Sequence, residues 1–143
     1  MTTLDEAAAL GREEQGLAVV STLRVDATIQ SSLVNAGVLE HPVSGTEVLA
    51  FATYGRVKLA NLRARPQIAV TFRAGWRWAT VEGRASLVGP RDGDLDPDRL
   101  RVLLRAIFVA AGGVHDDWDE YDRVMAEQGR TAVLIEPGRI YGN

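Results

Sequence analysis

The sequence predicts an α+β protein with a mainly antiparallel, six-stranded sheet that forms a small barrel with helices packed around it. Three observations predict this fold: β-branched segments separated by turns, two amphipathic helical segments after them, and one further strand-like segment near the end. The 143 residues suit a single domain. Within 1–143 we expect an N-terminal helix in 1–16, the main barrel strands in 17–88, a helical pair in 96–128 and a C-terminal strand in 131–142.

The N-terminal elements follow from periodicity and turn residues. Residues 3–15 place leucine and alanine near helical spacing before a glycine, which predicts a short helix. Segments 17–24 and 28–35 are rich in β-branched residues and flank a polar turn, so they predict a β-hairpin. A loop with glycine and proline over 36–46 then leads to a third strand at 47–53.

The middle of the chain predicts one helix and two strands. Residues 56–65 are good helix formers, and Pro66 ends that helix. Residues 67–72 alternate apolar and polar side chains, as strands do, and 76–88 predicts a longer strand.

The predicted strand 76–88 has no plainly solvated face. Trp76, Trp78 and Thr80 share one face, and alanine, valine and leucine side chains share the other. A second packing surface is therefore expected on this strand. The two tryptophans could stack on a planar ligand, but we expect them in the core, where such pairs are more often found.

The last third of the chain predicts two helices and a strand. Asp96 suits a helix N-cap and Pro97 the first helical position, ahead of a long apolar stripe. A second, acidic helix is expected between Asp116 and Gly129. Residues 131–136 then predict the last strand.

Composition excludes several classes of protein. The chain is 46% hydrophobic and 24% charged, which is ordinary for a globular domain. The absence of cysteine excludes disulfides, a thiol nucleophile and thiolate metal sites. His41 and His115 lie far apart without metal-ligand spacing around them, so no metal site is expected.

Localisation and macromolecular partners are also constrained. No apolar run approaches the roughly 20 residues of a transmembrane helix, and the polar, acidic start does not resemble a signal peptide. We therefore expect a cytoplasmic protein that does not bind membranes. A net charge of −3 gives no reason to expect nucleic-acid binding.

One basic region stands out as a candidate anion site. Residues 56–91 contain eight basic side chains and one acidic one, Glu82, and Lys58 is the only lysine of the chain. Arg56 and Lys58 follow Gly55 at the start of a predicted helix, where backbone N–H groups and two cations can surround a phosphate. The alternative is a solvated pair of cations at a helix start.

A polar cluster interrupts the second strand of the predicted hairpin. Strand alternation places Gln30 and Ser32 on one face, and Ser31 and Asn35 on the other. The cluster suits either a ligand site or an edge strand with a solvated face. No dinucleotide, phosphate-loop, zinc-protease or nucleophile-elbow motif is present.

Two long segments carry a resemblance to a known family. YGRVKLANLRARPQIAVTF followed by GWRWATVEGRASLVGP resembles the pyridoxamine-phosphate-oxidase-like split β-barrel family. The matching residues are Arg56, Lys58, Asn61, Leu62, Pro66, Val81, Glu82 and Gly83. The C-terminal segment 115–142, with its D-W-D-x-Y and P-x-x-x-Y-G patterns, is similar to the actinobacterial, deazaflavin-dependent branch (branch B).

The resemblance implies a homodimer with two cofactor sites at the subunit interface. It places the cofactor phosphate at Arg56 and Lys58, with Asn61 beside them and Thr53 supplying a hydroxyl. It places the cofactor ring along the second hairpin strand and near the indole of Trp78. The remaining implied cofactor-binding residues are Gln30, Ser31, Ser32, Asn35 and Trp78.

The resemblance implies an oxidoreductase that uses reduced coenzyme F420, a 5-deazaflavin, to reduce a small conjugated or quinone-like molecule. Its oxidase members carry a basic residue where Gln30 and Asn35 stand, which counts against FMN binding. The alternatives are an FMN- or haem-binding barrel, or a non-catalytic carrier or sensor of F420. No side chain is an obvious general acid, so the proton could come from water or from Tyr141.

Overall fold

The structure is a computed structural model that describes residues 2–93 and 95–143. Its helices and strands follow one another along the chain in this order: α1 (Leu4–Arg12), β1 (Leu17–Leu23), β2 (Ile29–Glu40), β3 (Glu47–Thr53), α2 (Arg56–Ala64), β4 (Gln67–Ala74), β5 (Arg77–Val88), α3 (Pro97–Ala110), α4 (Trp118–Glu127) and β6 (Thr131–Gly142).

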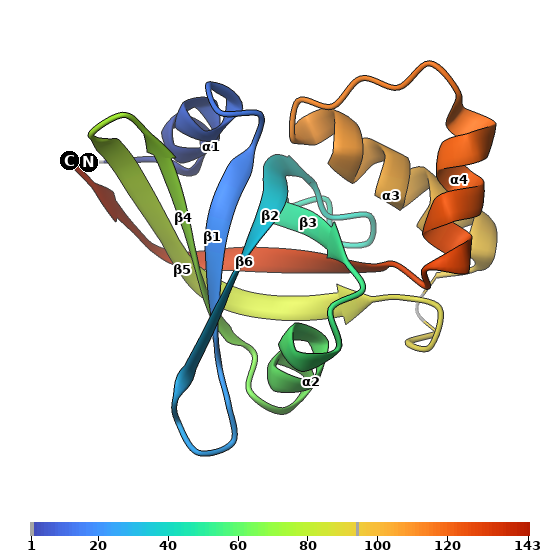
Figure 1. Ribbon diagram of the computed structural model, residues 1–143, viewed down its shortest axis with the longest axis horizontal. Helices are drawn as coiled ribbons and strands as arrows, with labels where there is room; N and C mark the ends of the chain where they lie inside the picture. The colour runs from blue at the N-terminus through green and yellow to red at the C-terminus, as the bar shows by residue number, and fades with distance from the viewer. Residues whose placement is uncertain (1, 94) are drawn as a thin grey trace.

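The six strands form a closed antiparallel barrel in the order β1-β2-β3-β6-β5-β4. The C-terminal strand β6 lies between β3 and β5, and β1 closes the barrel against β4. Figure 1 shows α1 and α2 near opposite ends of the barrel, and α3 and α4 together on one side. The predicted α+β fold, a six-stranded antiparallel barrel with peripheral helices, is confirmed.

Two apolar clusters hold the fold together. The first fills the barrel, where the side chains of Phe51 and Phe72 are fully buried. The second lies between the outer face of β3 and β6 and the inner stripe of α3, which includes Leu103 and Ile107. Successive residues of β3 therefore face different clusters, which explains why this strand is apolar from Val48 to Ala52.

The helices begin where the sequence indicates. The Thr3 hydroxyl accepts a hydrogen bond from the Glu6 amide at the start of α1. At the start of α3, the Asp96 carboxylate accepts from the Arg99 amide, and Pro97 occupies the first turn. These caps satisfy amides that the helix itself leaves free.

Two strands are longer than the sequence indicated. The predicted loop 36–46 is wrong over its first part, because β2 continues to Glu40 and pairs there with β3. The strand predicted at 131–136 continues to Gly142, in agreement with the broader segment 131–142. Pro137-Gly138 looks like a turn, but the register of β5 and β6 shifts at Gly83, and this bulge keeps the two strands paired.

The expectation that Trp76 and Trp78 lie in the core is wrong. Trp76 is 94% exposed in the turn before β5, and Trp78 is 38% exposed on the outer face of the barrel. Only Thr80 of that predicted face is buried. Among the described residues, no helix is long and apolar enough to cross a membrane.

Candidate functional site

The first half of β2 has an open strand edge. This strand pairs with β1 over residues 29–35 and with β3 only from Ala36 onward. The Ala36 amide donates to the Gly16 carbonyl, and the Thr28 carbonyl accepts from the Arg24 amide. Since the N–H and C=O of one strand residue point to the same side, even-numbered residues face β1.

The odd-numbered residues of this segment therefore direct their backbone groups to the open edge. Ser31 and Leu33 each present an N–H and a C=O there, while the Ile29 carbonyl is taken by the Arg24 guanidinium at 2.9 Å. The β1–β2 hairpin extends away from the rest of the barrel (Figure 1). A planar ligand with donors and acceptors on its rim could pair with this edge as a further strand would.

Beyond the end of β3, α2 carries the buried cation of the site. Lys58 is only 7% exposed, and its Nζ lies 3.4 Å from Thr53 Oγ1 and 5.9 Å from the centre of the Phe51 ring. No carboxylate of the described residues lies within ion-pair distance of it. Burial, reinforced by the charge of Arg130, lowers the pKa of Lys58. A cation held this way is stabilised by an anion.

Arg56 lies at the start of α2 but is exposed. It lines a cavity of about 470 Å³ together with two further arginines, Arg63 and Arg91. Of these three, Arg63 is paired with a carboxylate, that of Asp92 at 3.4 Å. Arg56 and Lys58 thus stand at the same helix start, one facing solvent and the other facing the barrel.

Asn61 has a structural role in this chain. Its amide donates to Thr22 Oγ1 at 3.0 Å, and its carbonyl oxygen accepts from Arg65 at 3.5 Å. The Thr22 hydroxyl in turn donates to Gln30 Oε1 at 3.1 Å. These bonds tie α2 to the β1–β2 hairpin, so Asn61 and Gln30 position the site.

The remaining residues of the polar cluster differ in their surroundings. The Ser31 hydroxyl is 3.0 Å from that of Ser21 on the outer face. The Ser32 Oγ atom is shielded from solvent, and no polar atom of the described chain bonds to it. The Asn35 amide donates to the Gln15 carbonyl at 2.9 Å. Ser32 is therefore the orphan of the cluster, a buried hydroxyl that a ligand could satisfy.

Trp78 and Tyr141 lie together on the outer face of β5 and β6. Their rings meet edge to face with centroids 6.0 Å apart, and the Tyr141 hydroxyl donates a short hydrogen bond to Glu82. This hydrogen bond raises the pKa of Tyr141, so its proton is held tightly. The roles predicted for Trp78 and Tyr141 stay predictions.

Sequence reasoning missed Arg130, the residue just before β6. Its guanidinium lies 4.3 Å from the centre of the Tyr54 ring and donates to the Ala52 carbonyl and the Gln128 side chain. Burial lowers its pKa, and among residues 2–93 and 95–143 no carboxylate is within ion-pair distance. It is one of fifteen arginines, so only its place in the fold distinguishes it.

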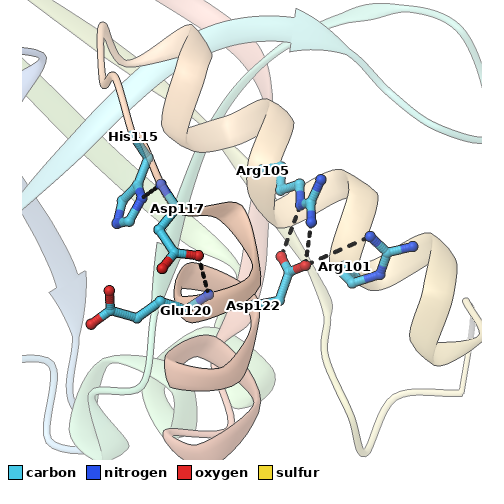
Figure 2. A network of polar contacts seen from close by, with 6 residues as sticks. All are labelled: Arg101, Arg105, His115, Asp117, Glu120 and Asp122. Carbon is cyan, nitrogen blue, oxygen red and sulfur yellow. Dashed lines mark hydrogen bonds and ion pairs between the residues drawn. The ribbon is translucent and has the colours of Figure 1, made fainter.

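A polar network fixes α4 beside the site (Figure 2). The Asp122 carboxylate of α4 binds the Arg105 guanidinium of α3 through both oxygens, and Arg101 approaches it at 3.6 Å. The hydrogen bonds from Arg105 lower the pKa of Asp122. At the start of α4, the Asp117 side chain accepts from the Glu120 amide, and the Asp117 amide donates to His115 Nδ1.

Fold and site together define a small antiparallel β-barrel protein in which Lys58 and Arg130 have no carboxylate partner within residues 2–93 and 95–143 and lie beside an open strand edge. The chain belongs to the pyridoxamine 5'-phosphate oxidase family, whose model matches residues 4–142. The predicted membership of this family is confirmed, and the deazaflavin-dependent branch stays a prediction.

Solved structures with this fold have several functions. A conserved hypothetical protein of Mycobacterium tuberculosis superposes with a TM-score of 0.70 at 18% identity, over 99% of this chain and 84% of that one. A protein described as an F420 reductase gives 0.59 at 19%, over 87% and 88%. An FMN-binding protein from Nostoc punctiforme, related to pyridoxamine 5'-phosphate oxidase, gives 0.62 at 13%, over 95% and 79%. At such identities these similarities establish the fold alone.

Proposed function

We propose that the protein is an oxidoreductase that binds the deazaflavin coenzyme F420 at the open edge of β2 and uses it to reduce a small conjugated or quinone-like molecule. The observation that carries this proposal is the buried Lys58 ammonium, which has no carboxylate partner among the described residues and stands beside that edge.

The donor set fits a phosphorylated ligand. A phosphate would take the Lys58 ammonium, the Thr53 hydroxyl and the Arg56 guanidinium as partners, and would neutralise a charge that burial now destabilises. Arg130 adds a second positive charge to the same region, since it contributes to the lowered pKa of Lys58. The Asn35 position, which is basic in the oxidases, is neutral here.

The ring of the cofactor would lie along β2. The backbone groups of Ser31 and Leu33 face that edge and suit the polar rim of a deazaflavin, and the orphan Ser32 hydroxyl offers a further hydrogen bond. The coenzyme supplies the hydride chemistry when it is bound. The protein orients the ring, holds the phosphate and covers one side from water.

A second copy of the chain would complete the site. The outer face of the β1–β2 hairpin exposes Val19, Ile29 and Leu33, which are 46%, 65% and 61% exposed in the single chain. Apolar side chains so placed are stabilised when a partner covers them. We therefore propose a homodimer whose interface includes this face and the outer face of β5.

The test compares three ligands and one reaction. Purified protein is titrated with F420, FMN and haem, by fluorescence quenching for the first two and by absorbance for haem. We expect the tightest binding for F420, and turnover of a quinone or enone by the protein with reduced F420. Tighter binding of FMN or haem would overturn the deazaflavin assignment, and F420 binding without turnover across the panel would indicate a carrier or sensor.

Lys58→Met, which removes the buried cation, should weaken F420 binding. Its control is Arg99→Met, which removes an exposed arginine of α3. It should bind F420 as the wild type does. A parallel loss of affinity in this variant would mean that net charge, rather than the site, governs binding.

A further inference from the structure

A second cavity has a volume of about 550 Å³. It is lined on one side by β2 and β3, near the point where these strands begin to pair, and on the other by α3, α4 and the segment that joins them. Its apolar wall includes Phe108, Tyr121 and Met125, and its polar groups include Gln15, Asn35 and Arg130. No acidic residue of the described chain lines it. The proposed hydride chemistry uses the edge of β2 and leaves this cavity unexplained.

The cavity wall is aromatic and firmly placed. The rings of Phe108 and Tyr121 have centroids 5.1 Å apart and are tilted by 51°. The Tyr121 hydroxyl is occupied, because it donates to the Leu104 carbonyl at 2.9 Å. This wall therefore offers flat apolar surface rather than hydrogen bonds, and flat rings pack well against it.

The polar side of the cavity has one unsatisfied charge. Arg130 Nε donates to Gln128 Oε1 at 2.8 Å, and one Nη donates to the Ala52 carbonyl at 3.3 Å. The other Nη atom has no partner within the described chain. One guanidinium nitrogen, with uncharged amides around it, matches a single negative charge better than the double charge of a phosphate monoester.

Backbone strain marks the same place. Gln15 adopts a left-handed conformation, with φ of 62°, and its carbonyl is held by the Asn35 amide. A residue other than glycine in that conformation is disfavoured, and such residues concentrate at ligand sites. Gln15 and Asn35 both line the cavity.

We propose that this cavity is a second binding site, for a planar aromatic carboxylate whose carboxylate pairs with Arg130 and whose ring packs against Phe108 and Tyr121. The site adjoins the cofactor phosphate site, since the charge of Arg130 also lowers the pKa of Lys58. It differs from that site in its aromatic wall and in its dependence on Arg130 rather than Lys58. The inference stands whichever redox cofactor occupies the edge of β2.

The experiment is isothermal titration calorimetry of the ligand-free protein with benzoate, acetate and inorganic phosphate. We expect benzoate to bind at least about tenfold more tightly than acetate, and phosphate to leave benzoate affinity unchanged. Arg130→Met should weaken benzoate at least about tenfold, as loss of a charge-assisted hydrogen bond does. Phe108→Leu, which keeps the charge, should weaken benzoate but leave acetate as it was.

Two controls separate this site from the cofactor site. Arg123→Met removes an exposed arginine of α4 that pairs with Glu127, and should not change benzoate binding. Lys58→Met should weaken F420 far more than benzoate, because Arg130 rather than Lys58 would pair with the benzoate carboxylate. Any of four outcomes would show that the proposed second site is wrong. They are no binding of benzoate by the wild type, acetate binding as tight as that of benzoate, competition by phosphate, and loss of benzoate binding in Lys58→Met.

A folding control distinguishes loss of binding from loss of structure. Circular dichroism melting first establishes that each variant is folded, and Arg130→Lys serves if Arg130→Met is not. That variant keeps the charge but loses the planar fork, so benzoate should bind more weakly than to wild type. Undiminished binding by Arg130→Lys would overturn the proposed guanidinium–carboxylate pair.

Discussion

The Lys58 ammonium lies 3.4 Å from the hydroxyl of Thr53, across the turn that joins β3 to α2. Thr53 Oγ1 also accepts a hydrogen bond from the Gly55 amide at 3.1 Å, so the hydroxyl is fixed from two sides. Strand end, turn and first helical turn thus form one unit around a single buried cation. This unit would hold the phosphate of the proposed cofactor.

Lys58→Met should weaken F420 binding by roughly 10- to 150-fold, because a charge-assisted hydrogen bond contributes about 1.5–3 kcal/mol. The fold should be retained, since the variant removes a charge that has no carboxylate partner among the described residues. Fluorescence titration measures the affinity, and a melting curve measures stability. Wild-type affinity in Lys58→Met would show that the phosphate binds elsewhere.

The stability of the ligand-free protein should depend on Lys58 at alkaline pH. Burial lowers its folded-state pKa below the ordinary 10.5, so between the two values the unfolded chain binds more protons and stability rises with pH. The destabilisation relative to Lys58→Met is complete below the folded-state pKa and disappears as pH approaches 10.5. Denaturation of both proteins across this range should show the two curves converging, and parallel curves would contradict the lowered pKa.

Ser32→Ala should separate stability from binding. The hydroxyl is buried without a partner, so its removal should leave the free energy of unfolding unchanged or raise it. If the hydroxyl binds the cofactor, affinity should fall by roughly 2- to 12-fold, as loss of a neutral hydrogen bond predicts. Ser86→Ala, which removes a β5 hydroxyl 3.5 Å from the Leu134 carbonyl, is the control for the binding measurement. A destabilised Ser32→Ala would mean that the hydroxyl already has a partner.

Leu33→Lys should dissociate the proposed homodimer. Leu33 is paired across the strands with Val19 on the exposed apolar face of the hairpin, and a buried lysine there would have no counter-charge. The dimer dissociation constant should rise more than tenfold in sedimentation experiments. Val102→Lys, at a similarly exposed position on α3, should have no effect. A wild-type protein that is monomeric at micromolar concentration would refute the dimer.

Gly37→Ala should destabilise the fold through a steric clash. A Cβ atom at this position would lie 2.3 Å from the carbonyl of Ala110, at the end of α3. Backbone cannot move away cheaply, so the expected loss is about 1–3 kcal/mol in chemical denaturation. Gly138→Ala is the matched control, since the nearest atom there is 3.7 Å away. Equal stability of the two variants would contradict this packing.

The sequence allowed the order and type of the elements to be predicted because their periodicity is local. It did not reveal the second half of β2, where glycine and alanine resemble a loop but pair with β3. The C-terminal strand was expected over 131–142, but the bulge opposite Gly83 that accommodates Pro137-Gly138 was not. Pairing partners are distant in sequence, so such extensions become visible only in three dimensions.

The site was predictable in part for the same reason. Lys58 stood out as the only lysine at a helix start, and the structure places it beside Thr53 as the resemblance implied. Asn61 was expected at the phosphate, yet its amide is committed to Thr22, a residue thirty-nine positions away. Arg130 was missed because its contacts with Tyr54 and the Ala52 carbonyl form only in the folded chain.

The position of β6 between β3 and β5 sets the order in which the chain can fold during synthesis. Until residues 131–142 have been made, β3 and β5 each keep an unpaired edge, and apolar side chains that β6 later covers remain accessible. Closure must therefore be a late event, with loop-closure entropy to overcome before the distant strands meet. A nascent chain halted before β6 would be an open sheet. Its free strand edges would be exposed to proteases and could pair with other nascent chains on the same mRNA.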